Sequence, residues 1–304
     1  LVAMIIVFSI VQPKFFTVTN LMNIYNQNAS LMLSACGLAM VMISGGIDLS
    51  IGYMASLCGI VAAMLMKNMH VNFIVSIIAA ILVGTLCGAL NGVLSNKLKI
   101  HTMIVTLATM TLFQGLSYII SQSKSFSSLP SAFRFIGQGY LGKLPVSIFA
   151  LIAIVAVVSF ILNKTHYGRY VYAIGGNPDA AHLAGINVER VRLRTFALNG
   201  ALVGLAAVLL ISRSGSASSA MGTSLQFDSI TACILGGVSF TGGSGKGSNA
   251  GLGVLCLGVL SNGMQLIGWG IYVQYVVKAI FLVIAIAFDM YTKNKVLADD
   301  AANG

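Results

Sequence analysis

Long apolar runs, poor in charge, alternate with short polar segments along the whole chain. A helix needs about 20 residues to cross a bilayer core of roughly 30 Å, and most of these runs approach that length. The first and eighth are shorter, and the eighth, which ends in Gly236 and Gly237, is expected to be a broken or re-entrant piece. The pattern predicts an all-α polytopic membrane protein in which residues 1–304 form a single transmembrane domain. The ten predicted spans lie near residues 1–12, 28–46, 51–66, 71–95, 102–121, 146–163, 195–212, 229–241, 249–267 and 271–290.

Composition agrees with a chain whose natural solvent is lipid. Hydrophobic residues make up 57% of the sequence and charged residues only 8%, against roughly 25% charged residues in soluble domains. The net charge is +10, but the basic residues lie between apolar runs without the interleaved aromatics that stack bases. We therefore interpret this charge as topological and expect no nucleic-acid partner. The five cysteines all lie inside apolar runs, without metal-ligand spacing.

Lysine and arginine are distributed unequally between alternate loops, which predicts the orientation. The richer set of loops is expected to face the cytoplasm, so that both termini are cytoplasmic and the chain lies in the inner membrane. The richer set holds Lys97, Lys99, Lys164, Arg169, Arg190, Arg192, Arg194, Lys246, Lys293 and Lys295. The alternate set holds Lys14, Lys67, Lys124, Arg134, Lys143 and Arg213.

Two segments suggest an internal repeat. AMVMISGGIDLSIG (39–52) and TACILGGVSFTGG (231–243) both place a Gly-Gly-apolar step after an apolar run, which pairs Gly45 with Gly236. Each step would join a descending helix to an ascending one, so the units 28–95 and 229–290 would share one orientation. Internal repeats with glycine-interrupted helices are typical of transporters, although an Ala/Gly-rich chain can also produce such a match by coincidence.

The first glycine step leads into a carboxylate. Gly45 and Gly46 let the backbone leave the helix, and Asp48 and Ser50 follow at the start of the next span. One interpretation is an N-cap at the cytoplasmic edge. The other is a polar group on a translocation path, since an ionised residue inside a membrane is costly and usually functional. The residues expected on or near such a path are Gly45, Gly46, Asp48, Ser50, Gln114 and Asn262, although buried amides also bond helix to helix.

The cytoplasmic loop 164–194 contains a short helix with clear boundaries. Asn177 can cap it, Pro178 suits its first turn, and Asp179 suits the positive end of its dipole. Gly185 is expected to end it. A short helix with small residues lets another protein approach closely.

Several motifs together resemble a known family. Asp179-Ala180-Ala181-x-x-x-Gly185 resembles the EAA-x3-G loop of ABC importer permeases, with Asp in the Glu position. SGGIDLSIG, GRYVYAIGGNPDAAHLAGINV and LGGVSFTGGSGKGS resemble the ribose-type sugar permeases in the same order over nearly the whole chain. The resemblance implies a membrane subunit that passes a monosaccharide, foremost a ribose-like pentose. The ATPase-coupling residues that it implies are Asn177, Pro178, Asp179, Ala180, Ala181, Gly185 and Ile186.

The same resemblance implies the partners. They are a cytoplasmic ABC ATPase that binds ATP and Mg, an extracytoplasmic sugar-binding protein, and a second permease subunit, either identical or related. The outer loops 122–145 and 213–228 are expected to meet the binding protein. The glycine loop at 241–248 is not a P-loop, because Gly247 follows Lys246 where Ser or Thr is required. No cofactor, metal site or catalytic set is expected, so the chain itself should not be an enzyme.

Two alternatives remain open. The importer could carry another small polar molecule, such as an autoinducer sugar or a nucleoside. An ion-coupled secondary transporter would place ionisable residues inside the bundle, and only Asp48 and Lys278 are candidates for that role. Finally, Gly84, Gly88 and Gly92 line one helix face, which favours close packing within the chain over contact with a second subunit.

Overall fold

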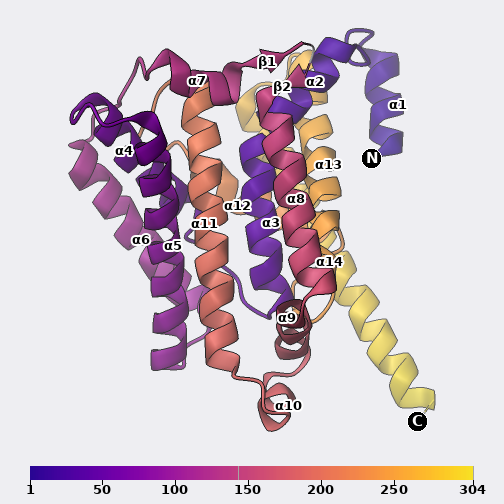
Figure 1. Cartoon of the computed structure of the whole chain (residues 1–304). Coiled ribbons are helices and arrows are strands. Elements are labelled where there is room, and N and C mark those ends of the chain that lie inside the picture. Colours follow the sequence, from indigo (N-terminus) through magenta and orange to yellow (C-terminus); the bar gives the residue numbers. More distant parts are fainter. Residues whose placement is uncertain (143, 304) are drawn as a thin grey trace.

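Helices running between two opposite ends make up nearly all of the molecule (Figure 1). This computed structural model describes residues 1–142 and 144–303, with side chains except at 248 and 293–303. The elements are α1 (Val2–Val11), α2 (Val18–Gln27), α3 (Ala29–Ile43), α4 (Ile51–Lys67), α5 (Phe73–Leu98), α6 (Thr102–Ser121), α7 (Ser131–Gln138), β1 (Tyr140–Leu141), β2 (Leu144–Pro145), α8 (Val146–Lys164), α9 (His166–Gly176), α10 (Pro178–Leu183), α11 (Val188–Ser214), α12 (Thr223–Leu235), α13 (Gly247–Leu266) and α14 (Ile271–Asn303).

The predicted all-α membrane class is confirmed. Within the described residues, five helices are long and apolar enough to cross a membrane: α5, α6, α8, α11 and α14. Helices α1, α3 and α4 are shorter and apolar. Every predicted span contains a helix, and α6 has the predicted ends at Thr102 and Ser121. The count of ten crossings stays a prediction, because several of these helices are shorter than a bilayer core requires.

Apolar pattern alone missed or misplaced some elements. Helices α2, α7 and α9 were not predicted, because they are short and carry too many polar residues to form an apolar run. The eighth span was expected at 229–241, but α12 covers Thr223–Leu235. The backbone turns at Gly237, where φ is +77°, so Val238 and Phe240 continue the apolar run without continuing the helix.

Helix α11 lies at the centre of the bundle and packs closely along α5 (Figure 1). The glycine row makes this approach possible. A Cβ at Gly84 would overlap the carbonyl oxygen of Gly200, and one at Gly88 would overlap that of Phe196. Backbones therefore touch directly along this face. The prediction that the row serves packing within the chain is confirmed.

Helices α3 and α12 end in the same backbone geometry. The Gly45 N–H donates to the Met42 carbonyl at 2.9 Å, and the Gly237 N–H donates to the Ile234 carbonyl at 2.8 Å. Both glycines have positive φ, +81° and +77°, as in helix ends closed by a left-handed residue. The equivalent of Gly45 is thus Gly237, one residue beyond the expected Gly236. Whether the full units 28–95 and 229–290 form a repeat stays a prediction.

Candidate coupling site and the broken helices beside it

The predicted short helix in the 164–194 loop is present as α10. The Asn177 side-chain oxygen accepts hydrogen bonds from the backbone N–H groups of Asp179 and Ala180, both at 3.0 Å. Pro178 occupies the first turn, where its missing N–H costs nothing. Gly185, with φ +84°, ends the helix as expected. Asn177 also ends α9, so α9 and α10 meet at a one-residue elbow.

One face of α10 points away from the rest of the chain. Leu183 is 87% exposed, whereas Ala181 is only 4% exposed and faces the chain itself. Asp179, Ala180 and His182 are also exposed. Of the expected coupling residues, Ala181 therefore packs inward. The EAA-like spacing did not single out Leu183. The sequence signal that could have identified it is an apolar residue within a short polar loop.

Two tyrosines fasten α9 to its neighbours. The Tyr167 hydroxyl lies 2.7 Å from the Thr195 hydroxyl on α11. The Tyr172 hydroxyl donates to the Gly245 carbonyl at 2.7 Å, in the loop between α12 and α13. Burial raises the pKa of the Tyr172 phenol, so this hydroxyl keeps the proton that it donates. Helix α9 thus connects the elbow to α11 and to the loop between α12 and α13, which we call the second glycine loop (residues 236–246).

Glycines from three segments meet above the elbow. The Gly243 N–H donates to the Ile43 carbonyl in the last turn of α3, at 2.9 Å. A Cβ at Gly175, in α9, would overlap that same carbonyl, and one at Gly242 would lie 2.7 Å from the Gly45 Cα. Only glycines allow three backbones to approach this closely. We call this contact, made by Ile43, Gly45, Gly175, Gly242 and Gly243, the glycine junction.

The chain between α3 and α4 is not helical, and α6 satisfies part of its backbone. The Thr102 hydroxyl accepts from the Ile47 N–H at 3.0 Å, and the Thr106 hydroxyl accepts from the Leu49 N–H at 3.1 Å. Thr106 also donates to the Ile47 carbonyl at 3.2 Å. The two threonines are one helical turn apart and replace bonds that the broken helix has lost. Irregular backbone in a membrane requires such partners.

Asp48 belongs to the same non-helical segment and is fully buried. Its side chain faces α5 and α11, whereas the backbone on either side of it is bonded to α6. Its carboxylate accepts from the Ser50 hydroxyl at 2.6 Å, the Ser50 N–H at 2.9 Å and the Asn199 amide at 2.9 Å. The Asn91 amide donates to Ser50 at 2.9 Å and lies 3.5 Å from both carboxylate oxygens. All of these neighbours present donors, which suits an ionised carboxylate. Asp48 therefore ties the broken segment to two other helices.

This geometry corrects the N-cap interpretation of Asp48. Ser50 occupies the N-cap position of α4 but makes no side-chain capping bond, because its hydroxyl is bonded to Asp48. The carboxylate is also 0% exposed, and so does not lie at an open edge. Sequence reasoning overlooked Asn91, although it stands three residues after Gly88 on the face that packs against α11.

The other predicted path residues divide between interior and surface. Asn262 exchanges hydrogen bonds with Asn20 at 2.8 and 3.0 Å and so bonds α13 to α2. Gln114 is half-buried and donates to the Tyr53 hydroxyl at 2.9 Å. Gly45 is exposed, whereas Gly46 is buried.

Among the described residues, no group of three or more His, Cys, Asp or Glu could hold a metal ion.

Two carboxylates hold α14 in place. Lys278 pairs with Asp228 of α12 at 2.9 Å, with each side chain 19% exposed. Asp289 accepts from the Phe240 N–H at 3.1 Å, in the second glycine loop. Lys278 is thus a partner in helix packing. Its counter-ion escaped the sequence analysis because Asp228 lay one residue outside the predicted span.

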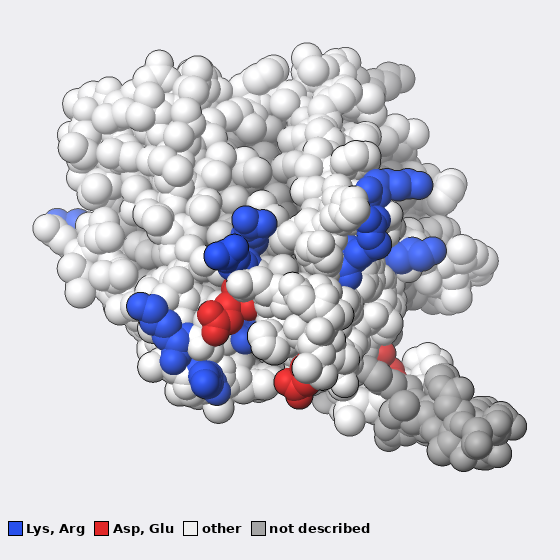
Figure 2. Space-filling view, turned by 60° about the horizontal axis from the view of Figure 1, so that its bottom comes forward, with Lys and Arg blue, Asp and Glu red and all other residues white. Residues whose placement is uncertain are grey.

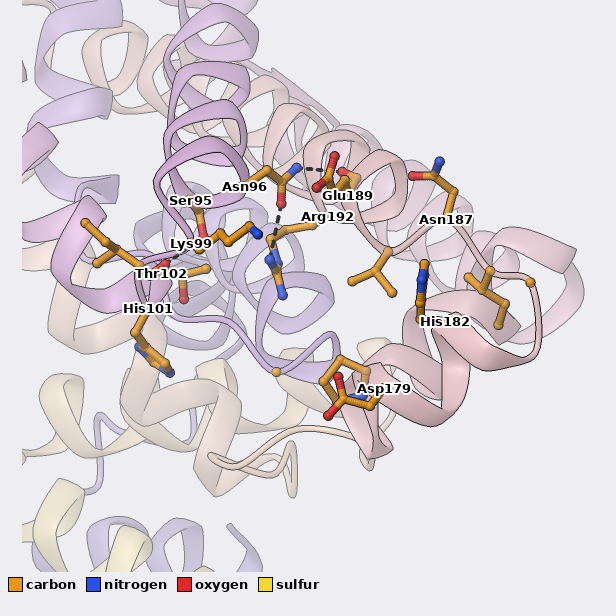
Figure 3. Close-up of a pocket in the computed structure, with 16 residues that line it drawn as sticks. Ser95, Asn96, Lys99, His101, Thr102, Asp179, His182, Asn187, Glu189 and Arg192 are labelled. Atoms are coloured by element: carbon orange, nitrogen blue, oxygen red, sulfur yellow. Dashed lines mark hydrogen bonds between the residues drawn. The ribbon is translucent and has the colours of Figure 1, made fainter.

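A cleft of about 940 Å³ opens beside α10 (Figure 3). It lies between α10, the end of α5, the start of α6 and the start of α11, and it reaches up to Gly45. Lys99, His101, His182 and Arg192 line it, together with Asp179 and Glu189. The Arg192 guanidinium donates to the Asn96 side chain at 3.2 Å.

Charged side chains gather on the end of the molecule that carries α10 (Figure 2). The basic residues there, at helix ends and in loops, are Lys97, Lys99, Lys164, Arg169, Arg190, Arg192, Arg194 and Lys246. The opposite end carries Lys14, Lys67, Lys124, Arg134 and Arg213. Lys143 and the side chains of Lys293 and Lys295, also assigned to loops from sequence, lie outside the described residues.

Comparison with known proteins places this architecture. Residues 20–286 match the family described as branched-chain amino acid transport system / permease component. The ribose import permease protein RbsC of Haemophilus influenzae is 36% identical over 98% of this chain and 93% of its own length. RbsC of Bacillus subtilis is 38% identical (94% and 89%), and the L-arabinose transport system permease protein AraH of Escherichia coli is 37% identical (92% and 85%). No solved structure matches. The chain, matched over most of its length, belongs to the branched-chain amino acid transport system permease component family.

Proposed function

We propose that the chain is the membrane subunit of an ABC importer that passes a monosaccharide, foremost a ribose-like pentose. The family description names amino acids, but the similar relatives are ribose and arabinose permeases at 36–38% identity. A transport subunit also agrees with a site made of packed helices and a docking helix. The ATP and Mg of the reaction belong to a partner ATPase, and the sugar is delivered by an extracytoplasmic binding protein.

The observation that carries the mechanism is the path from α10 to the glycine junction. Leu183, exposed at the tip of α10, suits insertion into an apolar groove of the ATPase. A push on α10 reaches α9 through the Asn177 elbow. Helix α9 touches α3 at Gly175 and the loop after α12 through Tyr172. ATPase motion would thus act on both broken helices together.

The end that carries α10 would then be cytoplasmic. It holds more of the described basic residues than the opposite end, as positive-inside orientation requires. In this orientation the helices would make the ten predicted crossings, with the units 28–95 and 229–290 parallel and both termini cytoplasmic. The opposite end, including α7 and the 213–228 loop, would meet the binding protein.

The solute path is proposed between two permease copies. The side chains of Asp48, Ser50 and Asn262 are buried and hydrogen-bonded to other residues of the chain, so they are not accessible to a sugar. Gln114 and Tyr53 are only half-buried and carry the amide and hydroxyl groups that a sugar needs. Such a path would bind sugar weakly, because these groups form no enclosed pocket of several polar groups.

An importer of another polar solute, such as an autoinducer sugar or nucleoside, would use the same machinery. An ion-coupled secondary transporter is less well supported. Of its two candidate residues, Lys278 is already paired with Asp228, and Asp48 is enclosed by donors. Neither has the free proton or ion site that such coupling requires.

Copurification tests the class of transporter, and a ligand screen tests the solute. A tagged chain should retain an ABC ATPase in detergent, and an intact chain purified without an ATPase would contradict the proposal. The partner binding protein should bind ribose more tightly than arabinose, nucleosides or autoinducer sugars. Tighter binding of another solute would replace ribose without changing the transporter class.

A further inference from the structure

An apolar groove adjoins the charged cleft beside α10. The groove, of about 280 Å³, lies between the last turns of α5 and the first half of α6. Leu94, Leu98, Ile104, Ala108 and Leu112 line it. Its polar content is one hydroxyl, that of Thr109, which is already bonded to the Thr106 carbonyl at 3.3 Å. Ile100 lines both the groove and the cleft, so the two form one continuous depression.

Two cations reach into the cleft near Ile100, where the groove and the cleft meet. Lys99 ends α5 in the left-handed conformation, with φ +54°, and Arg192 projects from the start of α11 (Figure 3). Within the described part of the chain, neither lies within 4 Å of a carboxylate, since the one ion pair found there joins Lys278 to Asp228. The charge of Glu189, one helical turn earlier on α11, acts on Arg192, so Lys99 is the cation with no carboxylate beside it. A basic site that adjoins an apolar groove suits a ligand with an anionic head and a hydrocarbon tail.

We propose that this depression binds one anionic phospholipid of the phosphatidylglycerol type. One acyl chain lies in the α5–α6 groove, and the phosphodiester lies between Lys99 and Arg192. The acidic residues of the cleft agree with this head group. Asp179 lies on α10, apart from Lys99 (Figure 3), so it can accept hydrogen bonds from the glycerol hydroxyls, whereas Glu189 lies beside Arg192. A second permease copy would fill the groove but leave Lys99 without an anion.

The site also gives the lipid a place in coupling. The cleft is bounded by α10 on one side and reaches Gly45 of the glycine junction on the other. A lipid head group there would contact both α10 and the glycine junction. The proposal depends on the chain being embedded in a membrane and not on which solute it carries, so failure of the sugar assignment would leave it intact.

The head-group half is tested by lipid retention. The purified chain, in nanodiscs of equal phosphatidylglycerol and phosphatidylcholine, is moved to detergent and the retained lipid is counted by native mass spectrometry. Phosphatidylglycerol should be retained, and K99A should lower its retention roughly five-fold, as for loss of one cation near a lipid surface. K97A removes an exposed lysine two residues away that does not line the cleft, and should retain lipid normally. Equal retention of both lipids, or equal loss in K97A and K99A, would overturn the proposal.

The groove half needs a separate variant. A108W fills the groove, and A153W adds the same bulk at an exposed position of α8. A108W alone should lose the retained phosphatidylglycerol. If A108W instead converts a dimer to a monomer with lipid retention unchanged, a second copy occupies the groove and the proposal fails. It also fails if inorganic phosphate competes the lipid away at millimolar concentration, since the site would then be a simple anion site.

Discussion

The backbone N–H of Gly243 donates a 2.9 Å hydrogen bond to the carbonyl oxygen of Ile43. This bond joins the loop after α12 to the last turn of α3, although the two residues are 200 positions apart in the chain. Helix α9 packs against the same carbonyl through Gly175. A movement of α9 is therefore expected to act on both broken helices.

Gly175→Ala should uncouple the chain from its ATPase. The added Cβ would overlap the Ile43 carbonyl. The backbone shift that removes such an overlap costs about 1–3 kcal/mol. Transport should fall roughly ten-fold, while the amount of folded protein in the membrane changes little. Gly176→Ala is the matched control, because a Cβ there meets nothing within 4 Å. Normal transport by the Gly175 variant would show that the glycine junction does not transmit motion.

Asp48→Asn should destabilise the fold. The variant amide turns an N–H₂ group toward neighbours that are themselves donors, and bonds to a charged acceptor contribute about 1.5–3 kcal/mol each. We expect a loss of about 3 kcal/mol, seen as a lower thermal midpoint in detergent. Asp179→Asn, on exposed α10, serves as control and should leave the midpoint unchanged. A stable Asp48 variant that fails only in transport would place Asp48 on the solute path instead.

Leu183→Glu should weaken ATPase capture without affecting folding. The side chain is 87% exposed, so a charge costs the isolated chain little, whereas an apolar groove would reject it. Loss of such an anchor reduces affinity roughly ten-fold or more. Leu141→Glu, at the opposite end and 57% exposed, should bind the ATPase normally. Equal binding by both variants would remove α10 as the docking element.

The Lys278–Asp228 pair distinguishes packing from ion coupling. Lys278→Met leaves a mostly buried carboxylate unpaired and should cost about 2–3 kcal/mol, since removal of one partner is more harmful than removal of both. Asp228→Leu in the same chain should restore stability and solute uptake. If the double variant is stable but transports nothing, Lys278 or Asp228 takes part in transport directly.

Local features were predictable from sequence, and long-range ones largely were not. The span over Thr102–Ser121 and the helix from Pro178 have apolar or turn signals within a few residues. The neighbours of Asp48 come from α5 and α11, 43 and 151 residues away, and no local pattern announces them. The Gly84–Gly92 row did predict a tight helix contact, but not that α11 supplies it. The one-residue shift from Gly236 to Gly237 arose because adjacent glycines are indistinguishable until the backbone shows which one has positive φ.

The most direct test of the account is uptake of labelled ribose into proteoliposomes that contain the chain, its ATPase and the binding protein. Ion gradients are collapsed with ionophores, and ATP is supplied on the side that carries α10. We predict uptake that requires both ATP and the binding protein and that persists with the ionophores present. Uptake by the chain alone, driven by a proton or sodium gradient and indifferent to ATP, would contradict the account.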